Sequence, residues 1–279
     1  MVFGGYSLRG TWTRRIIIAN ILVALAGLLL RFFGRPDYIM EFGALFVPDL
    51  LRGWLWQPLT YMWIHAQPEG LGVLHILFNM LTLAAFGPVV ERNLGPKHFW
   101  RLYLLGGLVS GLFFAFESMA RIIFGLGVPL PLVGASGAVL AICAAFAWMF
   151  PEARLFVLFI PVPIKARTVV IGAILVSMVL MLLDPGSFIA HSAHLGGLLF
   201  GVAYMWRLTR TLERLGYAVR EPAREVPITV LARVDDPLEG WDQHRLELEA
   251  DRVLEKISRY GLGALTERDR DVLERVRRR

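Results

Sequence analysis

The segment PLVGASGAVLAI, residues 131–142, places one serine between glycines at the start of a long apolar stretch. Ser136 is its only polar side chain, and no charged residue follows before Phe150. A membrane-spanning helix needs about 20 mostly apolar residues, so this stretch predicts one. Small residues also let helix backbones approach closely. Packing is therefore the alternative to a chemical role for GASGA.

The rest of the chain has the composition of a membrane protein. Of its 279 residues, 56% are hydrophobic and 19% are charged, against about 25% charged residues in soluble domains. We therefore predict an all-α polytopic membrane protein with a six-transmembrane-helix bundle in residues 1–206. The expected spans are 16–33, 71–90, 99–116, 132–150, 169–183 and 188–206.

Charged residues are concentrated at the C-terminal end, where more than half of them follow Trp206. Pro222 and Pro227 interrupt a first part that we interpret as a linker, residues 207–240. Residues 241–279 then predict a cytosolic helical hairpin. Thr266 and Asp269 form a capping box for its second helix. We expect the hairpin to serve docking or stability, with a cytosolic protein as its candidate partner.

Apolar residues of the first hairpin helix recur at helical spacing. The predicted buried stripe consists of Leu246, Val253, Leu254 and Ile257.

Basic residues alternate between the loops. They gather before the first span, after the second, after the fourth and after the sixth: Arg9, Arg14, Arg15, Arg92, Lys97, Arg101, Arg154, Lys165, Arg167, Arg207, Arg210 and Arg214. Cytoplasmic loops carry such an excess, so we expect both termini in the cytoplasm. We attribute the net charge of +6 to the basic loops that set the orientation of the chain in the membrane. We therefore expect no nucleic-acid partner.

Strongly polar side chains within the predicted spans are few. His75 and Asn79 are four residues apart and share a helix face, and His194 lies in the sixth span. In this topology their helices start outside, as does the helix of Ser136. At 1.5 Å per residue, the expected depths are about 6 Å for Ser136 and His75, about 9 Å for His194 and about 12 Å for Asn79. Such groups usually face the bundle interior or a water-filled cavity.

These groups suit nucleophilic catalysis. A serine hydroxyl needs a base, and histidine titrates nearest to neutral pH. The Asn79 amide, the His75 ring and the Ser136 backbone N–H are candidate oxyanion donors. Three glycines, Gly137, Gly197 and Gly201, allow the fourth and sixth helices to approach. His191 is the alternative base.

Other membrane activities fit less well. A zinc metalloprotease would carry HExxH, which is absent from the sequence, and Asp184 is the only aspartate near the spans that an aspartyl protease would use. A transporter would show broken helices in matching halves. We expect no metal and no cofactor.

Five motifs in this order resemble the rhomboid intramembrane serine proteases: WQPLTYMWIH at 56–65, His75-x-x-x-Asn79, ERNLG at 91–95, GASG at 134–137 and AHLGGLLFG at 193–201. The resemblance covers residues 14 to 206 and extends to bacterial six-helix forms with a cytosolic C-terminal extension. It implies a six-helix rhomboid-like bundle.

The resemblance also implies residue roles. Ser136 becomes the nucleophile and His194 its general base and later acid, without a third carboxylate. His75, Asn79 and the Ser136 amide become the oxyanion site, next to Gly134, and Glu91 becomes the carboxylate that anchors a helix end.

The sequence departs from the family pattern twice. The family often has an aromatic residue four positions after the serine, where this chain has Leu140, and a Trp-Arg pair where it has Trp56 and Gln57. Leu140 leaves the packing partner of the imidazole unidentified, and Gln57 removes a salt bridge to Glu91.

The resemblance thus implies hydrolysis of a peptide bond near the outer end of substrate transmembrane helices. The expected partners are transmembrane protein substrates and the lipid bilayer, and the expected location is the bacterial cytoplasmic membrane. The main alternative is a rhomboid-like protein that binds transmembrane helices without cutting them. Such proteins lack the serine or the histidine, and this chain has both.

Overall fold

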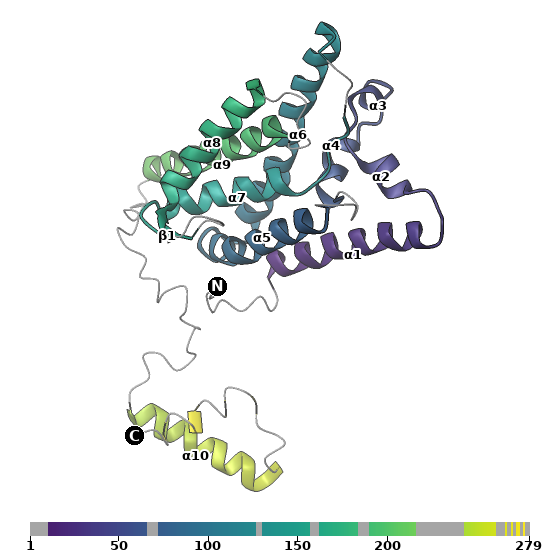
Figure 1. Cartoon of the computed structure of the whole chain (residues 1–279). Coiled ribbons are helices and arrows are strands. Elements are labelled where there is room, and N and C mark those ends of the chain that lie inside the picture. Colours follow the sequence, from purple (N-terminus) through teal and green to yellow (C-terminus); the bar gives the residue numbers. More distant parts are fainter. Residues whose placement is uncertain are drawn as a thin grey trace. The chain divides into compact units, whose positions relative to one another are not determined.

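The computed structural model describes residues 11–65, 72–126, 130–156, 162–183, 190–215 and 243–260, together with residues 266, 269, 272, 273 and 276. They belong to two compact units, of which the first ends with residue 215 among these residues and the second begins with residue 243. Each unit is shown in Figure 1.

The first unit is a bundle of apolar helices. Four of them are long and apolar enough to cross a membrane: α1 (Trp12–Phe32), α5 (Gly72–Leu94), α6 (Pro96–Phe124) and α8 (Ala166–Leu183). They coincide with four of the predicted spans, and the chain is an all-α integral membrane protein.

The other two predicted spans correspond to α7 (Ser136–Met149) and α9 (His191–Arg214). With 14 residues, α7 is about 21 Å long at 1.5 Å per residue, which is shorter than a hydrocarbon core of about 30 Å. α9 is long enough, but its histidines, glycines and terminal arginines lower its hydropathy. Both are helices of the interior rather than of the lipid-facing surface.

The arrangement of the bundle explains this difference. α7 packs against α5, α6, α8 and α9 (Figure 1), and its alanines are almost fully buried. α1 and α8 lie at the periphery and expose large apolar side chains such as Leu22 and Leu182. Lipid tails are as apolar as these side chains, so a bilayer accommodates this surface.

The expected start of the fourth span at Leu132 is wrong. Residues 132–135 are not helical, and α7 begins at Ser136. Leu132 instead exchanges two backbone hydrogen bonds with Leu45, of 2.8 and 2.9 Å. Gly134 donates its N–H to the Tyr61 carbonyl at 3.0 Å. A non-helical, extended segment thus directly precedes Ser136.

Leu45 and Tyr61 belong to the long first loop. It contains α2 (Tyr38–Gly43), α3 (Val47–Leu51), α4 (Gln57–Thr60) and the 3₁₀ helix η1 (Tyr61–Trp63), which the sequence analysis did not predict. The Tyr61 hydroxyl donates to the Gly107 carbonyl of α6 at 2.6 Å. The loop is therefore fixed to the bundle on the side where α7 begins.

Two short strands, β1 (Arg154–Leu155) and β2 (Ile164–Lys165), form an antiparallel ribbon between α7 and α8. Residues 157–161, between the two strands, lie outside the described part of the chain. Glu152 pairs with Lys165 and Arg167, each at 2.7 Å. These ion pairs connect the end of α7 to the start of α8.

The second unit contains α10 (Gln243–Tyr260). Leu246 and Ala250 of this helix form a small core with Val272, against which Leu273 packs. The predicted capping box is confirmed, because Thr266 N–H donates to Asp269 Oδ2 at 2.8 Å and Asp269 N–H donates to Thr266 Oγ1 at 3.2 Å.

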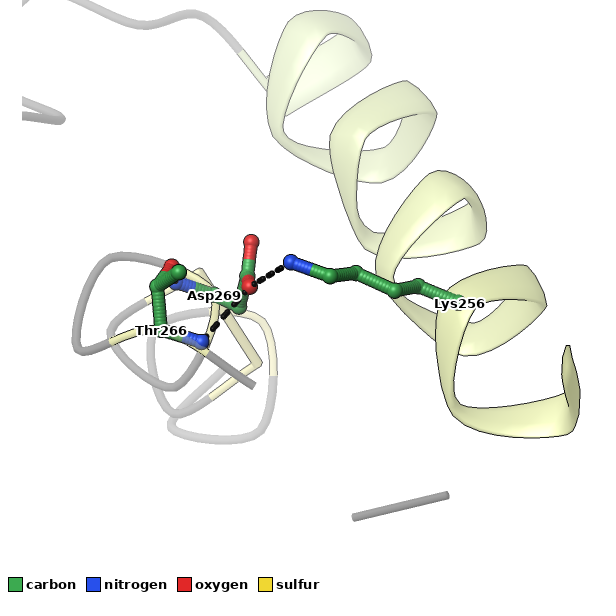
Figure 2. Close-up of polar contacts among 3 residues, drawn as sticks. All are labelled: Lys256, Thr266 and Asp269. Atoms are coloured by element: carbon green, nitrogen blue, oxygen red, sulfur yellow. Dashed lines mark hydrogen bonds and ion pairs between the residues drawn. The ribbon is translucent and has the colours of Figure 1, made fainter. Parts of the chain in front are cut away.

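Figure 2 shows that Lys256 of α10 also reaches the Asp269 carboxylate, at 2.7 Å. Like the small core around Val272, this contact joins α10 to the second arm of the predicted hairpin. Hydrogen bonds from Lys256 and Thr266 lower the pKa of Asp269 to about 2.

The buried stripe of α10 is corrected at one position. Leu246 and Val253 are buried as predicted, but Leu254 is 53% exposed. Successive helical residues are about 100° apart, so Leu254 lies on the next face and Ala250 completes the stripe. The predicted linker also begins later, because α9 continues past Trp206 to Arg214.

Candidate active site

Ser136 is the first residue of α7. The N–H groups in the first turn of a helix have no intrahelical acceptor, and the positive end of the helix dipole lies there. The serine thus lies beside unpaired backbone donors, within a largely apolar bundle. Its side chain is only partly buried, so it remains reachable.

His194 lies in the first turn of α9 and contacts this serine. Its Nε2 is 2.8 Å from Ser136 Oγ, which is hydrogen-bond distance. In the tautomer with an unprotonated Nε2, the hydroxyl donates to the ring nitrogen. The structure therefore brings together the two residues that the sequence analysis selected. Ser136 begins α7 and does not follow a helical turn, so its expected depth of about 6 Å stays a prediction. Its contact with His194 places it level with the first turn of α9.

Glycines allow this approach. A Cβ on Gly197 would collide with the backbone carbonyl of Gly137, and one on Gly201 would lie 2.5 Å from the carbonyl oxygen of Ala141. The backbones of α7 and α9 are therefore in direct contact. Gly197 packs against Gly137 as expected, while Gly201 packs one turn further along α7.

Two side chains of α6 hold the first turn of α9, and the sequence analysis missed both. Ser110 Oγ donates to the Ala193 carbonyl at 2.6 Å. Glu117 accepts a hydrogen bond of 2.5 Å from the buried Ser192 hydroxyl.

His75 and Asn79 lie on α5. A Cβ on Gly134 would be 2.5 Å from His75 Cε1, so the His75 ring lies against the GASG segment. Gly134 also has a φ of 117°, which L side chains rarely adopt. The buried Asn79 amide donates to the His75 carbonyl at 2.9 Å, within its own helix.

The remaining histidines differ from His194. His191 is buried, and its ring lies edge-on to that of His194 with centroids 6.5 Å apart. His65 is buried beside His75, and neither of its ring nitrogens is hydrogen-bonded among the described residues. His194 is the histidine that contacts Ser136.

Glu91 lies at the other end of the bundle. Its carboxylate accepts from Trp12 N–H at 2.8 Å, from Thr13 N–H at 3.0 Å and from Thr13 Oγ1 at 2.8 Å. It therefore caps the start of α1. Gln57 is fully buried and accepts from Phe46 N–H at 3.1 Å, so it holds the first loop.

A serine hydroxyl on a histidine nitrogen, beside free helix N-terminal amides, can attack a carbonyl carbon and stabilise the resulting oxyanion. No cluster of His, Cys, Asp or Glu suited to a metal occurs in the described part of the chain.

Residues 52–211 match the Rhomboid domain, which is more than half of the chain. The chain belongs to the rhomboid family. The match includes the GASG segment and the first turn of α9, so the Ser136–His194 contact lies inside the rhomboid domain.

The rhomboid chain is similar to several curated proteins. It is 32% identical over 141 residues to yeast Rhomboid protein 1, mitochondrial, covering 50% of this chain and 39% of the relative. It is 29% identical over 153 residues to the human presenilin-associated rhomboid-like protein, mitochondrial, covering 52% and 39%. RHOMBOID-like protein 12, mitochondrial, from Arabidopsis thaliana is 30% identical over 214 residues, covering 70% and 61%.

This rhomboid therefore spans less than two thirds of the length of these relatives. Their names place them in mitochondria, and they lend no support to the expected bacterial cytoplasmic membrane.

Proposed function

We propose that this rhomboid is an intramembrane serine endopeptidase with a Ser136–His194 dyad. The observation that carries the proposal is the 2.8 Å contact between Ser136 Oγ and His194 Nε2. A binding protein that does not cut has no need for this hydrogen bond at a helix N-terminus.

The reaction follows from the geometry. Ser136 Oγ attacks the peptide carbonyl carbon while its proton moves to His194 Nε2. The Ser136 N–H, His75 and Asn79 stabilise the oxyanion. Collapse of the intermediate breaks the C–N bond, and His194 returns the proton to the leaving amine. Water then hydrolyses the acyl-enzyme, with His194 as base.

For Asn79 this role is compatible with the hydrogen bond that its amide already makes. Its amide donates to the His75 carbonyl, and a second N–H of the same amide group is available for the oxyanion.

The substrate class follows from the location of the site. A peptide bond within a helix is covered by its own hydrogen bonds, so we propose transmembrane substrates with helix-weakening Gly or Pro and small side chains near the scissile bond. Since α7 is shorter than a bilayer core, Ser136 lies below the outer membrane surface. Cleavage therefore falls near the outer end of the substrate helix.

We further propose six membrane spans with both ends of the bundle domain, residues 1–206, on the cytoplasmic side. This orientation rests on the alternation of basic loops. The linker then lies between α9, which ends at Arg214, and residue 240, and the hairpin of residues 241–279 docks a cytosolic partner or stabilises the chain. A bacterial cytoplasmic membrane remains a prediction.

Cleavage of a single-span test substrate by the purified full chain tests the proposal. Mass spectrometry should locate the cut near the outer end of the substrate helix. Ser136→Ala and His194→Ala should each lower the rate by more than about 10³-fold, while Ser177→Ala, a buried serine of α8, should leave it unchanged. Substrate binding without cleavage by the wild type would instead favour the helix-binding function.

A further inference from the structure

A basic and aromatic patch lies where α1 and α6 begin. We define it by Trp12, Arg15, Lys97 and Trp100. The two indole rings meet edge-on, with centroids 5.2 Å apart and an interplanar angle of 68°. Arg15 Cζ lies 4.3 Å from the centroid of the Trp12 ring. The patch is therefore one contiguous surface built by two helices.

Lys97 is assigned to this surface because of its position relative to Trp100. It precedes Trp100 by three residues in α6, and residues three apart lie on the same helix face. Both Lys97 and Arg15 are exposed. Each indole thus has a cation beside it.

Among the residues that the structure describes, no carboxylate forms an ion pair with Arg15 or Lys97. The first turns of α1 and α6 contain no acidic residue. Glu91, which contacts the start of α1, uses both carboxylate oxygens for the backbone of Trp12 and Thr13 and for the Thr13 hydroxyl. Glu91 offsets part of the local charge, but the surface of the patch carries exposed cations only.

The patch lies at a membrane surface. It stands at the first turn of two helices that are apolar and long enough to cross a bilayer. Trp and Lys or Arg are the residues that favour the level of the lipid headgroups.

We propose that the patch binds the phosphate of an anionic phospholipid headgroup. A guanidinium whose face stacks on an indole keeps its N–H edges free, so Arg15 can donate to phosphate oxygens while resting on Trp12. Lys97 supplies a second charge-assisted hydrogen bond. The indole rings offer amphipathic surface to the glycerol and ester region beneath the phosphate.

The test uses the full chain in bilayer nanodiscs. Tryptophan quenching by brominated phosphatidylglycerol is compared with quenching by brominated phosphatidylcholine, and the two curves give a relative affinity. A basic residue near an anionic surface contributes about fivefold to binding, so Arg15→Gln with Lys97→Gln should lower the preference for phosphatidylglycerol by roughly 25-fold.

The matched control is Arg210→Gln with Arg214→Gln. These exposed residues of α9 lie at the end opposite to His194, and α5 likewise runs from His75 to Glu91, so both pairs lie at the same membrane face. The control measures the general charge effect of two basic residues at this face, and the patch variant should lose at least about fivefold more preference than the control because it also removes the hydrogen bonds to the phosphate. The single variant Lys97→Gln, expected to lose about fivefold, keeps the test valid if the double variant does not fold.

Three results would overturn the proposal. The wild type would show no preference for phosphatidylglycerol, or both double variants would lose the preference equally, which would indicate a general charge effect. Alternatively, inorganic phosphate would relieve the quenching at concentrations comparable to the lipid, which would assign the patch to free phosphate.

Discussion

At the scale of single residues, the Ser136–His194 dyad depends on backbone contact between α7 and α9. Gly197 has no space for a side chain because the Gly137 carbonyl occupies the position of its Cβ. If the helices separate by even a fraction of an ångström, His194 moves away from Ser136.

Gly197→Ala should therefore destabilise the protein by about 3 kcal/mol and abolish cleavage. Gly172→Ala in α8 is the matched control, since a Cβ there meets nothing within 4 Å; it should be neutral or stabilise by up to about 1 kcal/mol. Thermal unfolding in detergent measures both. Equal midpoints for the two variants would contradict the close contact.

Asn79 offers a second test at this scale. Asn79→Ala should lower kcat by about 10- to 1000-fold, the loss expected for one oxyanion donor, with little change in stability. Asn93→Ala is matched, because the Asn93 amide also donates to the carbonyl four residues earlier in α5. If both variants retain wild-type kcat, Asn79 is not part of the site.

At the scale of elements, the first turn of α9 is held from α6. Glu117 accepts from Ser192 and also lies 3.8 Å from Arg121, while Ser110 holds the neighbouring carbonyl. These contacts fix the helix on which His194 is carried.

A double-mutant cycle tests the Glu117–Ser192 contact. Glu117→Ala and Ser192→Ala should each destabilise the protein, and the two should couple by about 1.5 kcal/mol, the range for a hydrogen bond to a charged group. Glu117→Gln should recover part of kcat because it keeps an acceptor oxygen. Additive effects in the cycle would mean that the two side chains act independently.

The second unit has its own pH dependence. The pKa of Asp269 is lowered from 3.8 to about 2 in the folded state. A lowered folded-state pKa adds stability above the unfolded value, and this stability is lost as the pH falls from about 4 to about 2. The contact is solvent-exposed, so the effect is small.

Asp269→Asn reproduces the protonated form at neutral pH. Amide hydrogen exchange of α10 in the full chain should become about two- to fivefold faster. Asp251→Asn, an exposed carboxylate of the same helix, should leave the exchange unchanged. Unchanged exchange in Asp269→Asn would show that the contact in Figure 2 does not stabilise α10.

The sequence predicted elements well where hydropathy alone decides them. The apolar runs of α1, α5, α6 and α8 were found because lipid faces these helices. The start of α7 was misplaced because Leu132 and Val133 are as apolar as the helical residues that follow them. The backbone pairing of Leu132 with Leu45 is a long-range contact that no local sequence pattern reveals. The short helices of the first loop were missed for the same reason.

At the scale of the whole molecule, the site depends on a short central helix inside a ring of longer ones. α7 is about 21 Å long at 1.5 Å per residue, and the extended segment before it ends directly at Ser136. Longer helices at the periphery face the lipid.

The candidate site was predictable to the extent that its residues stand out in apolar surroundings. Four polar side chains lie in the predicted membrane spans: Ser136, His75, Asn79 and His194. Because burying a polar side chain in a bilayer costs free energy, such residues are candidates for a functional role. The contact between Glu117 and Ser192 was not predictable. The local sequence around Glu117 is the same whether its carboxylate faces water or a serine of another helix. His191 and His194 were separated by glycine spacing, and the Ser136 contact agrees with that choice.

The most direct measurement is labelling of Ser136 by a fluorophosphonate, which reacts with serines activated by a base. The wild type should be labelled, and Ser136→Ala and His194→Ala should not. His191→Ala is the matched control, because His191 is a buried histidine in the same turn of α9 but without a bond to the serine; it should be labelled at least about tenfold faster than His194→Ala. Labelling that survives His194→Ala but is lost in His191→Ala would contradict the Ser136–His194 dyad.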